Sequence, residues 1–179
     1  LLRQLKRELA PAGERSGAIR YYGRSLYEYP LSELSPQIGL VLQDPDSQIV
    51  MDDVLRELAF GMENIGLKPD VMRRRAAEIA PIFGMEPWLH RRTSQLSGGQ
   101  KQLLNLAAVL ALQPKLVLLD EPTAQLDPVA AREFLQLLHT LTRERGLTVI
   151  LSEHRLDEVV TMCDRMLVLD QGELVYGGE

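Results

Sequence analysis

Two adjacent carboxylates, Asp120 and Glu121, follow an unbroken apolar run at residues 116–119. Such a run indicates a strand that is buried on both faces, as in a parallel sheet. Because ligands of open α/β sheets bind outside the carboxyl ends of the strands, we expect both acids beside a nucleotide and its metal. Successive residues of a strand point to opposite sides, so one acid can hold Mg²⁺ while the other addresses a water. The alternative is that the two acids only end the strand.

A second polar cluster, Ser97, Gly98, Gly99 and Gln100, opens a segment whose apolar residues recur at helical spacing. The first amides of a helix have no partner inside it, and the helix dipole favours an anion at that end. The two glycines also allow close approach of the backbone. The cluster therefore predicts a helix that begins at Ser97 and a docking site for phosphate. An ordinary capped helix is the alternative.

The two stretches together resemble known motifs. Residues 96–100, Leu-Ser-Gly-Gly-Gln, resemble the signature motif of the ATP-binding cassette (ABC) family, and residues 116–123, Leu-Val-Leu-Leu-Asp-Glu-Pro-Thr, resemble its Walker B motif. The resemblance extends over essentially the whole chain. It implies an α/β fold of the P-loop NTPase type, with a mostly parallel sheet and an inserted helical subdomain, and ATP and Mg²⁺ as ligands.

The same resemblance implies roles for single residues. Glu121 would polarise the attacking water, Asp120 and Gln43 would hold Mg²⁺, and His154 would contact the γ-phosphate. Asp127 matches the aspartate of the family's D-loop, which communicates across a dimer. From the residues alone, Gln43 and His154 can also be incidental polar residues at strand ends, and Asp127 followed by a proline is a good helix start.

The implied site is shared between two subunits. Two cassettes pack head to tail, and each ATP lies between the phosphate loop of one subunit and the helix start at residues 97–100 of the other. The partner is either a copy of this chain or a related ATPase. Catalysis of phosphoryl transfer rests mainly on positioning and on neutralisation of charge.

Residues 1–179 are expected to form one cassette domain. Residues 1–50 and 113–179 are assigned to the α/β core, and residues 51–112, where the apolar period is helical, to the helical signature subdomain. Further elements are expected in the core: strands at residues 17–23, 38–42 and 147–151, a helix from residue 128 to Gly146, a helix through residue 163, and a hairpin that turns at Gln171-Gly172.

The first ten residues have the apolar spacing of a helix, and Pro11 and Gly13 end the pattern. In the ABC family a helix of this appearance follows the phosphate-binding loop G-x-x-x-x-G-K-[ST], and the 179 residues contain no such loop. We therefore expect an N-terminally truncated cassette that lacks its first strands and, by itself, hydrolyses no ATP.

Composition narrows the class of protein. The 179 residues are 45% hydrophobic and 25% charged, with no apolar run long enough to span a membrane. A net charge of −5 argues against nucleic acid as a partner. The single cysteine, Cys163, excludes a disulfide within the chain, fits a reducing cytoplasm and is expected in the core.

The sequences of residues 43–50 and 58–67 narrow the resemblance to the ATPases of energy-coupling-factor importers, which take up vitamins and cobalt or nickel ions. This implies a transmembrane coupling protein as partner and a peripheral location at the cytoplasmic face of the membrane. Two alternatives stay open: an ABC ATPase of repair or translation, and a catalytically incompetent cassette that supplies only its signature half-site.

Overall fold

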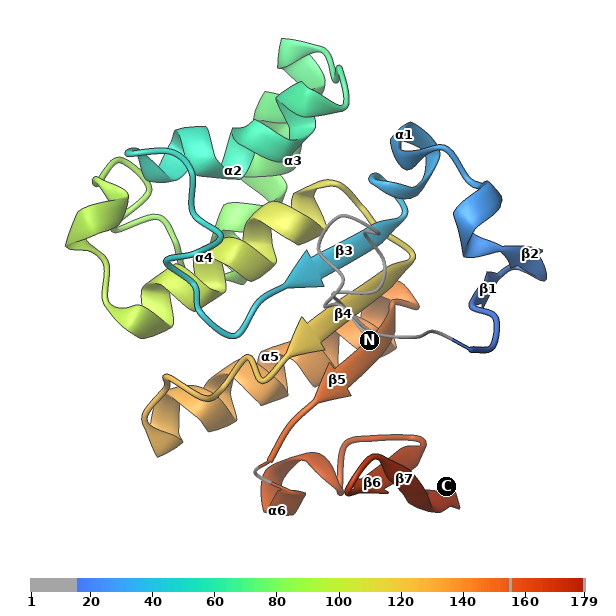
Figure 1. Cartoon of the computed structure of the whole chain (residues 1–179). Helices are drawn as coiled ribbons and strands as arrows, with labels where there is room; N and C mark the ends of the chain where they lie inside the picture. The colour runs from blue at the N-terminus through green and yellow to red at the C-terminus, as the bar shows by residue number, and fades with distance from the viewer. Residues whose placement is uncertain (1–15, 155, 179) are drawn as a thin grey trace.

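The centre of the molecule is a three-stranded parallel sheet (Figure 1). The computed structural model describes residues 16–154 and 156–178, so the predicted helix over residues 1–10 lies outside it. The strands are β3 (Ile38–Val41), β4 (Leu116–Asp120) and β5 (Thr148–Ser152), in the order β3-β4-β5. Residues 117–119 of the central strand β4 are at most 2% exposed. The expected strand buried on both faces is therefore confirmed.

The strand expected at residues 147–151 is present as β5. Its apolar run predicts a buried strand, and this prediction is wrong. Thr148, Ile150 and Ser152 are exposed, while Val149 and Leu151 are half-buried. Within the described residues β5 pairs with β4 alone, so it lies at an edge of the sheet with one face toward solvent. A continuous apolar run did not distinguish this edge position from a central one.

Three helices lie together beside the sheet: α2 (Val54–Asn64), α3 (Pro69–Ile82) and α4 (Gly98–Ala111) (Figure 1). The side chain of Asp53 caps α2 by accepting from the amides of Leu55 and Arg56. Pro81 lies inside α3, one residue before its end, so it does not shorten the helix appreciably. The apolar faces of these helices and of the sheet form one core.

Gly39 of β3 allows α4 to lie directly on the sheet. A Cβ added at Gly39 would lie 2.2 Å from Cγ1 of Val109 in α4, which is closer than two carbon atoms can approach. The contact fixes the distance between the helix and the strand that leads to Gln43. The close packing of α4 on β3 therefore depends on the absence of a side chain at Gly39.

Helix α5 (Pro128–Arg145) follows β4 and contributes Phe134, Leu138 and Leu141 to the core. It begins at Asp127 as expected and ends at Gly146, whose φ of 61° is a left-handed conformation that glycine adopts easily. No described helix is long and apolar enough to span a membrane.

Short elements complete the structure, and all but η4 lie toward the two ends of the chain. They are β1 (Arg20–Tyr21), β2 (Arg24–Ser25), η3 (Leu26–Glu28), α1 (Leu31–Leu34), η4 (Thr93–Gln95), α6 (Leu156–Val159), β6 (Met166–Asp170) and β7 (Glu173–Gly178). The single strand expected at residues 17–23 is instead a small hairpin, because Tyr22 and Gly23 have φ values of 48° and 79° and reverse the chain. The hairpin turning at Gln171-Gly172 is confirmed.

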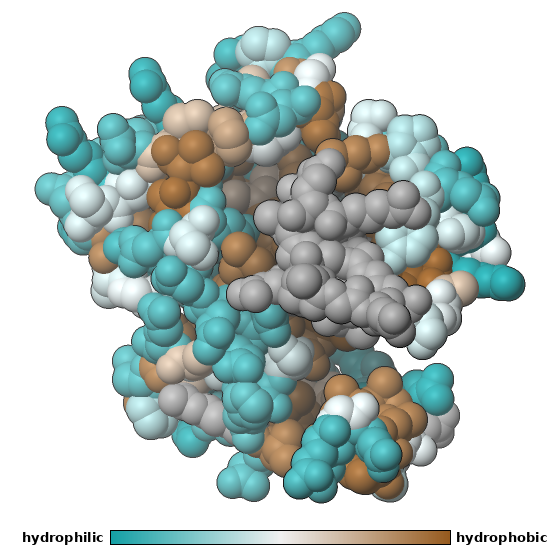
Figure 2. Space-filling model, viewed as in Figure 1, coloured by the Kyte–Doolittle hydropathy of each residue, from teal (hydrophilic) through white to brown (hydrophobic). Residues whose placement is uncertain are grey.

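Cys163 is exposed, and the prediction that it packs in the core is wrong. Helix α6 ends at Val159, so the helical stripe that would have buried Cys163 does not reach it. The nearby hairpin β6–β7 also exposes apolar side chains, among them Leu167 at 67% and Leu169 at 69%. Figure 2 shows this brown surface where β6 and β7 lie in Figure 1.

Candidate functional site

The carboxylate of Glu121 lies between two side chains from other strand ends. Nε2 of Gln43 donates to Oε2 of Glu121 at 2.9 Å, and Nε2 of His154 lies 2.8 Å from Oε1. Gln43 comes two residues after β3, Glu121 directly follows β4, and His154 comes two residues after β5. Parallel pairing brings these three carboxyl ends to one edge of the sheet. The structure thus brings Gln43, Glu121 and His154 together at that edge.

Asp120 and Glu121 are held differently, as expected for neighbours at a strand end. Oδ1 of Asp120 accepts a hydrogen bond from Oγ of Ser152 at 2.7 Å. The amide of Glu121 donates to the carbonyl of Ser152 at 3.0 Å, and Glu121 has an unusual positive φ of 44°. Ser152 thus fixes both the Asp120 carboxylate and the backbone from which Glu121 projects. Ser152 was not among the residues predicted from the sequence, where it is marked only as a polar residue after the apolar run at residues 147–151.

Ser97 and Gln100 form a reciprocal cap at the start of α4. Oγ of Ser97 accepts from the amide of Gln100 at 3.2 Å, and Oε1 of Gln100 accepts from the amide of Ser97 at 3.0 Å. Within the described part of the chain, the amides of Gly98 and Gly99 have no hydrogen-bond partner. The predicted helix start is confirmed, and two of its N–H groups are free to bind an anion.

The start of α4 packs beside the loop that contains Asp127. A Cβ added at Gly99 would lie 3.7 Å from Leu126, and one at Gly98 would lie 3.9 Å from the carbonyl of Gln125. Oδ1 of Asp127 accepts from the amides of Val129 and Ala130 at 2.9 and 3.0 Å. Asp127 is therefore the N-cap of α5. Only one oxygen of its carboxylate is used in this cap.

The predicted residues thus form two groups. Gln43, Asp120, Glu121 and His154 gather at the carboxyl edge of the sheet, while residues 97–100 lie with the loop that ends at Asp127. The chemistry of the first group suits a metal-bound polyphosphate, because it combines acid, amide and imidazole side chains. The second group offers free amides.

The residues present are compatible with Mg²⁺ bound to a polyphosphate. Among residues 16–154 and 156–178, no three His, Cys, Asp or Glu side chains gather as a metal site. Mg²⁺ usually takes only one or two protein ligands and completes its shell with phosphate oxygens and waters. Asp120 uses one oxygen toward Ser152, and Gln43 donates its NH₂ group to Glu121, so each keeps an oxygen available as a ligand.

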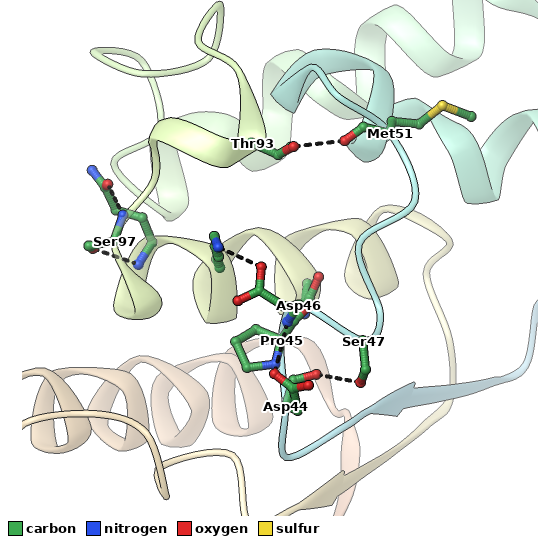
Figure 3. Close-up of polar contacts among 10 residues, drawn as sticks. Asp44, Pro45, Asp46, Ser47, Met51, Thr93 and Ser97 are labelled. Carbon is green, nitrogen blue, oxygen red and sulfur yellow. Dashed lines mark hydrogen bonds and ion pairs between the residues drawn. The ribbon is translucent and has the colours of Figure 1, made fainter.

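The loop after β3, residues 43–49, is fixed by polar contacts that the sequence analysis did not find. Gln48 acts as a local strand partner, since its Oε1 accepts from the amide of Leu42 and its Nε2 donates to the carbonyl of Leu40, each at 2.9 Å. The buried carboxylate of Glu57 accepts from the amides of Val50 and Met51 at 2.9 and 2.7 Å. Figure 3 shows the loop against α4 and the further contact of Thr93 with Met51.

Comparison with known proteins gives consistent sequence matches. Residues 1–124 match the family described as ABC transporter. A Bacillus cereus protein, named provisionally as an ABC transporter ATP-binding protein, is 52% identical over 178 residues, which are 99% of this chain and 32% of that protein. The energy-coupling factor transporter ATP-binding protein EcfA1 of Ligilactobacillus salivarius is 40% identical over 92% of this chain and 58% of its own length. The chain thus spans less than two thirds of either relative.

Two solved structures show the same fold. The structure of cbiO1 from Clostridium perfringens, described as part of the ABC transporter complex cbiONQ, matches with a TM-score of 0.82 and 35% identity over 91% of this chain and 66% of cbiO1. The dimeric ATP-binding cassette MJ0796, in a post-hydrolysis state bound to ADP and Pi, matches with a TM-score of 0.77 and 26% identity over 92% of this chain and 73% of that one. The predicted α/β fold is confirmed.

Proposed function

Because the chain belongs to the ABC transporter family, we propose that it is the nucleotide-binding part of a transport ATPase. The observation that carries this proposal is the placement of Gln43 and His154 on either side of Glu121. Three strands separated widely in sequence converge on one carboxylate, beside a second carboxylate that keeps a free oxygen. Hydrolysis of a polyphosphate needs such a base and such a metal ligand.

In the proposed reaction Glu121 accepts the proton of the attacking water. Asp120 and the amide oxygen of Gln43 hold Mg²⁺, which neutralises charge on the phosphates when it is bound. His154 is exposed on 82% of its side chain and so can leave Glu121 to contact the γ-phosphate. The free amides at residues 98 and 99 bind the phosphates of an ATP held by a second cassette, and Asp127 lies at the same interface.

We assign the transporter to the energy-coupling-factor type. The support is the similarity to EcfA1 and to cbiO1, which are parts of transporters by their names. The proposed partners are a second ABC ATPase, either identical or related, and a transmembrane coupling protein at the cytoplasmic face of the membrane. Purification of the full-length protein from membranes should recover a polytopic membrane protein with it. Recovery with nucleic acid and without a membrane protein would contradict this assignment.

The ATPase assignment is tested by changing Glu121 to Gln in the full-length protein. Loss of the general base is expected to lower ATP turnover by roughly 10²–10⁴-fold, while ATP still binds because the amide keeps the shape of the side chain. Steady-state phosphate release and equilibrium binding of ATP measure the two effects. The matched control is Glu144→Gln on the exposed face of α5, which should leave turnover unchanged. Equal turnover by wild type and Glu121→Gln would remove Glu121 from this role.

A further inference from the structure

Three polar side chains of α4 hold the loop that carries Gln43. They are Lys101, Gln102 and Asn105, which we call the α4 tether. Gln102 and Asn105 are each 1% exposed, although they lie among the apolar residues of the helix. The side chain of Lys101 is 17% exposed. Buried polar side chains at these positions require an explanation, because apolar residues would fill the same core at lower cost.

The contacts of the α4 tether lie on both sides of Gln43 in the sequence, and Figure 3 shows two of them as dashed lines between α4 and the loop. The tether makes three contacts in all. Nε2 of Gln102 donates to the carbonyl of Leu42 (3.3 Å), and Nδ2 of Asn105 donates to the carbonyl of Pro45 (3.1 Å). Nζ of Lys101 donates to Oδ1 of Asp46 (2.5 Å). The backbone that carries Gln43 is thus fixed to α4 before and after this residue.

The energetics of Asn105 indicate that it fixes position more than it adds stability. Within the described residues, Oδ1 of Asn105 is buried with no hydrogen-bond partner, which lowers the stability of the folded protein. The carbonyl of Pro45 does not depend on Asn105, because it also accepts from the amides of Gln48 and Ile49, each at 3.2 Å. Removing the Asn105 amide therefore leaves no unpaired group behind.

We propose that the α4 tether positions Gln43 against Glu121. Since α4 begins at Gly98, directly after its N-cap Ser97, the tether makes the loop follow any movement of that helix start, where the nucleotide of a second cassette is proposed to bind. The positions of Gln43 and of the free amides are then coupled within one chain. This role rests on the proposed ATPase function, but the fixation of the loop can be measured without it.

Hydrogen exchange of the full-length protein tests the fixation. In Asn105→Ala the loop amides of Asp46, Gln48 and Ile49 should exchange about tenfold faster, because one hydrogen bond to α4 is lost. The thermal midpoint should stay the same or rise, since alanine favours the helix and no buried oxygen is left unpaired. Unchanged exchange of these amides in a folded Asn105→Ala protein would overturn the proposal.

Arg75→Met is the matched control for this experiment. Nη1 of Arg75 donates to the carbonyl of Ala111 at 2.9 Å, so the variant removes a comparable hydrogen bond at the opposite end of α4. Exchange of the loop amides should not change in this variant. Equal acceleration in Arg75→Met and Asn105→Ala would show that any loosening of α4 releases the loop, and would overturn a specific role for the tether.

Kinetics test whether the tether acts through Gln43. Asn105→Ala should lower kcat with little change in KM, and the double variant Gln43→Ala, Asn105→Ala should be no slower than Gln43→Ala alone. Effects that multiply in the double variant would overturn action through Gln43. Absence of ATP turnover in the wild-type protein would instead contradict the proposed function, and the exchange experiment would then decide the fixation by itself.

Discussion

At the scale of single residues, the site depends on how each carboxylate is held. Glu121 uses both of its oxygens, toward Gln43 and His154, and Asp120 uses one of its oxygens toward Ser152. The motif predicted the two acids and their different tasks. It did not predict Ser152, because the hydrogen bond depends on the register in which Ser152 pairs with Asp120 across β4 and β5.

Ser152→Ala should weaken the response of the ATPase to Mg²⁺. Loss of the Oγ hydrogen bond frees the Asp120 carboxylate to rotate, and groups that orient a metal ligand typically contribute about 10–100-fold to metal affinity. We expect the Mg²⁺ concentration for half-maximal turnover to rise by about tenfold or more. Ser152→Thr keeps the hydroxyl and serves as the control. An identical Mg²⁺ response in Ser152→Ala would show that Ser152 does not orient Asp120.

At the scale of elements, helix starts and one close contact position the site. Asp127 and Ser97 were both predicted as the start of a helix, and both side chains accept hydrogen bonds from the first amides of their helices. Capping is local, so the sequence carries it. The contact of Gly39 with Val109 is not local, because these residues are brought together by the packing of α4 on β3.

Asp127→Ala should destabilise α5. The variant removes the hydrogen bonds to the amides of Val129 and Ala130, and loss of an N-cap typically costs about 1 kcal/mol. In a protein of this size that corresponds to a fall of about 2–4 °C in the thermal midpoint, measured by circular dichroism. Asp127→Asn retains an accepting oxygen, so its thermal midpoint should fall less than that of Asp127→Ala. An equal fall in both variants would indicate that charge, and not capping, sets the contribution of Asp127.

Gly39→Ala should destabilise the packing of α4 on β3. The added methyl group would overlap Cγ1 of Val109, and overpacking of this kind typically costs about 1–3 kcal/mol. Denaturant unfolding measures the loss. Val109→Ala removes the overlapping group, so the double variant should be less destabilised than the sum of the two single changes. Simple additivity would mean that the two positions are not in contact.

At the scale of the whole molecule, the predicted site residues form two separate groups. Gln43 and His154 contact Glu121 at the edge of the sheet, where Ser152 holds Asp120. The free amides at residues 98 and 99 lie instead beside the loop before Asp127. The proposed head-to-tail dimer accounts for this division, because each ATP then uses one group from each subunit. The proposed division of each site between two subunits can be tested by mixing two inactive variants.

Two inactive variants of the full-length protein should restore each other when they are mixed. Glu121→Gln removes the base, and Ser97→Arg places a bulky cation at the helix start. In a mixed dimer of two copies one site carries both defects and the other carries neither, so ATP turnover should reappear. Each variant incubated with itself is the control. Failure to recover turnover would contradict a site shared between two copies of this chain.

The sequence by itself determined the local features: the buried central strand, the capped starts of α4 and α5, and the acids at the end of β4. These follow from apolar period, capping side chains and motif order, which act over a few residues. Only the tertiary structure decided that β5 lies at an edge of the sheet that residues 16–154 and 156–178 form, that Cys163 is exposed, that Ser152 contacts Asp120, and that side chains of α4 contact the loop after β3. Those features depend on strand order, on where a helix ends and on contacts between residues far apart in sequence, which no local pattern encodes.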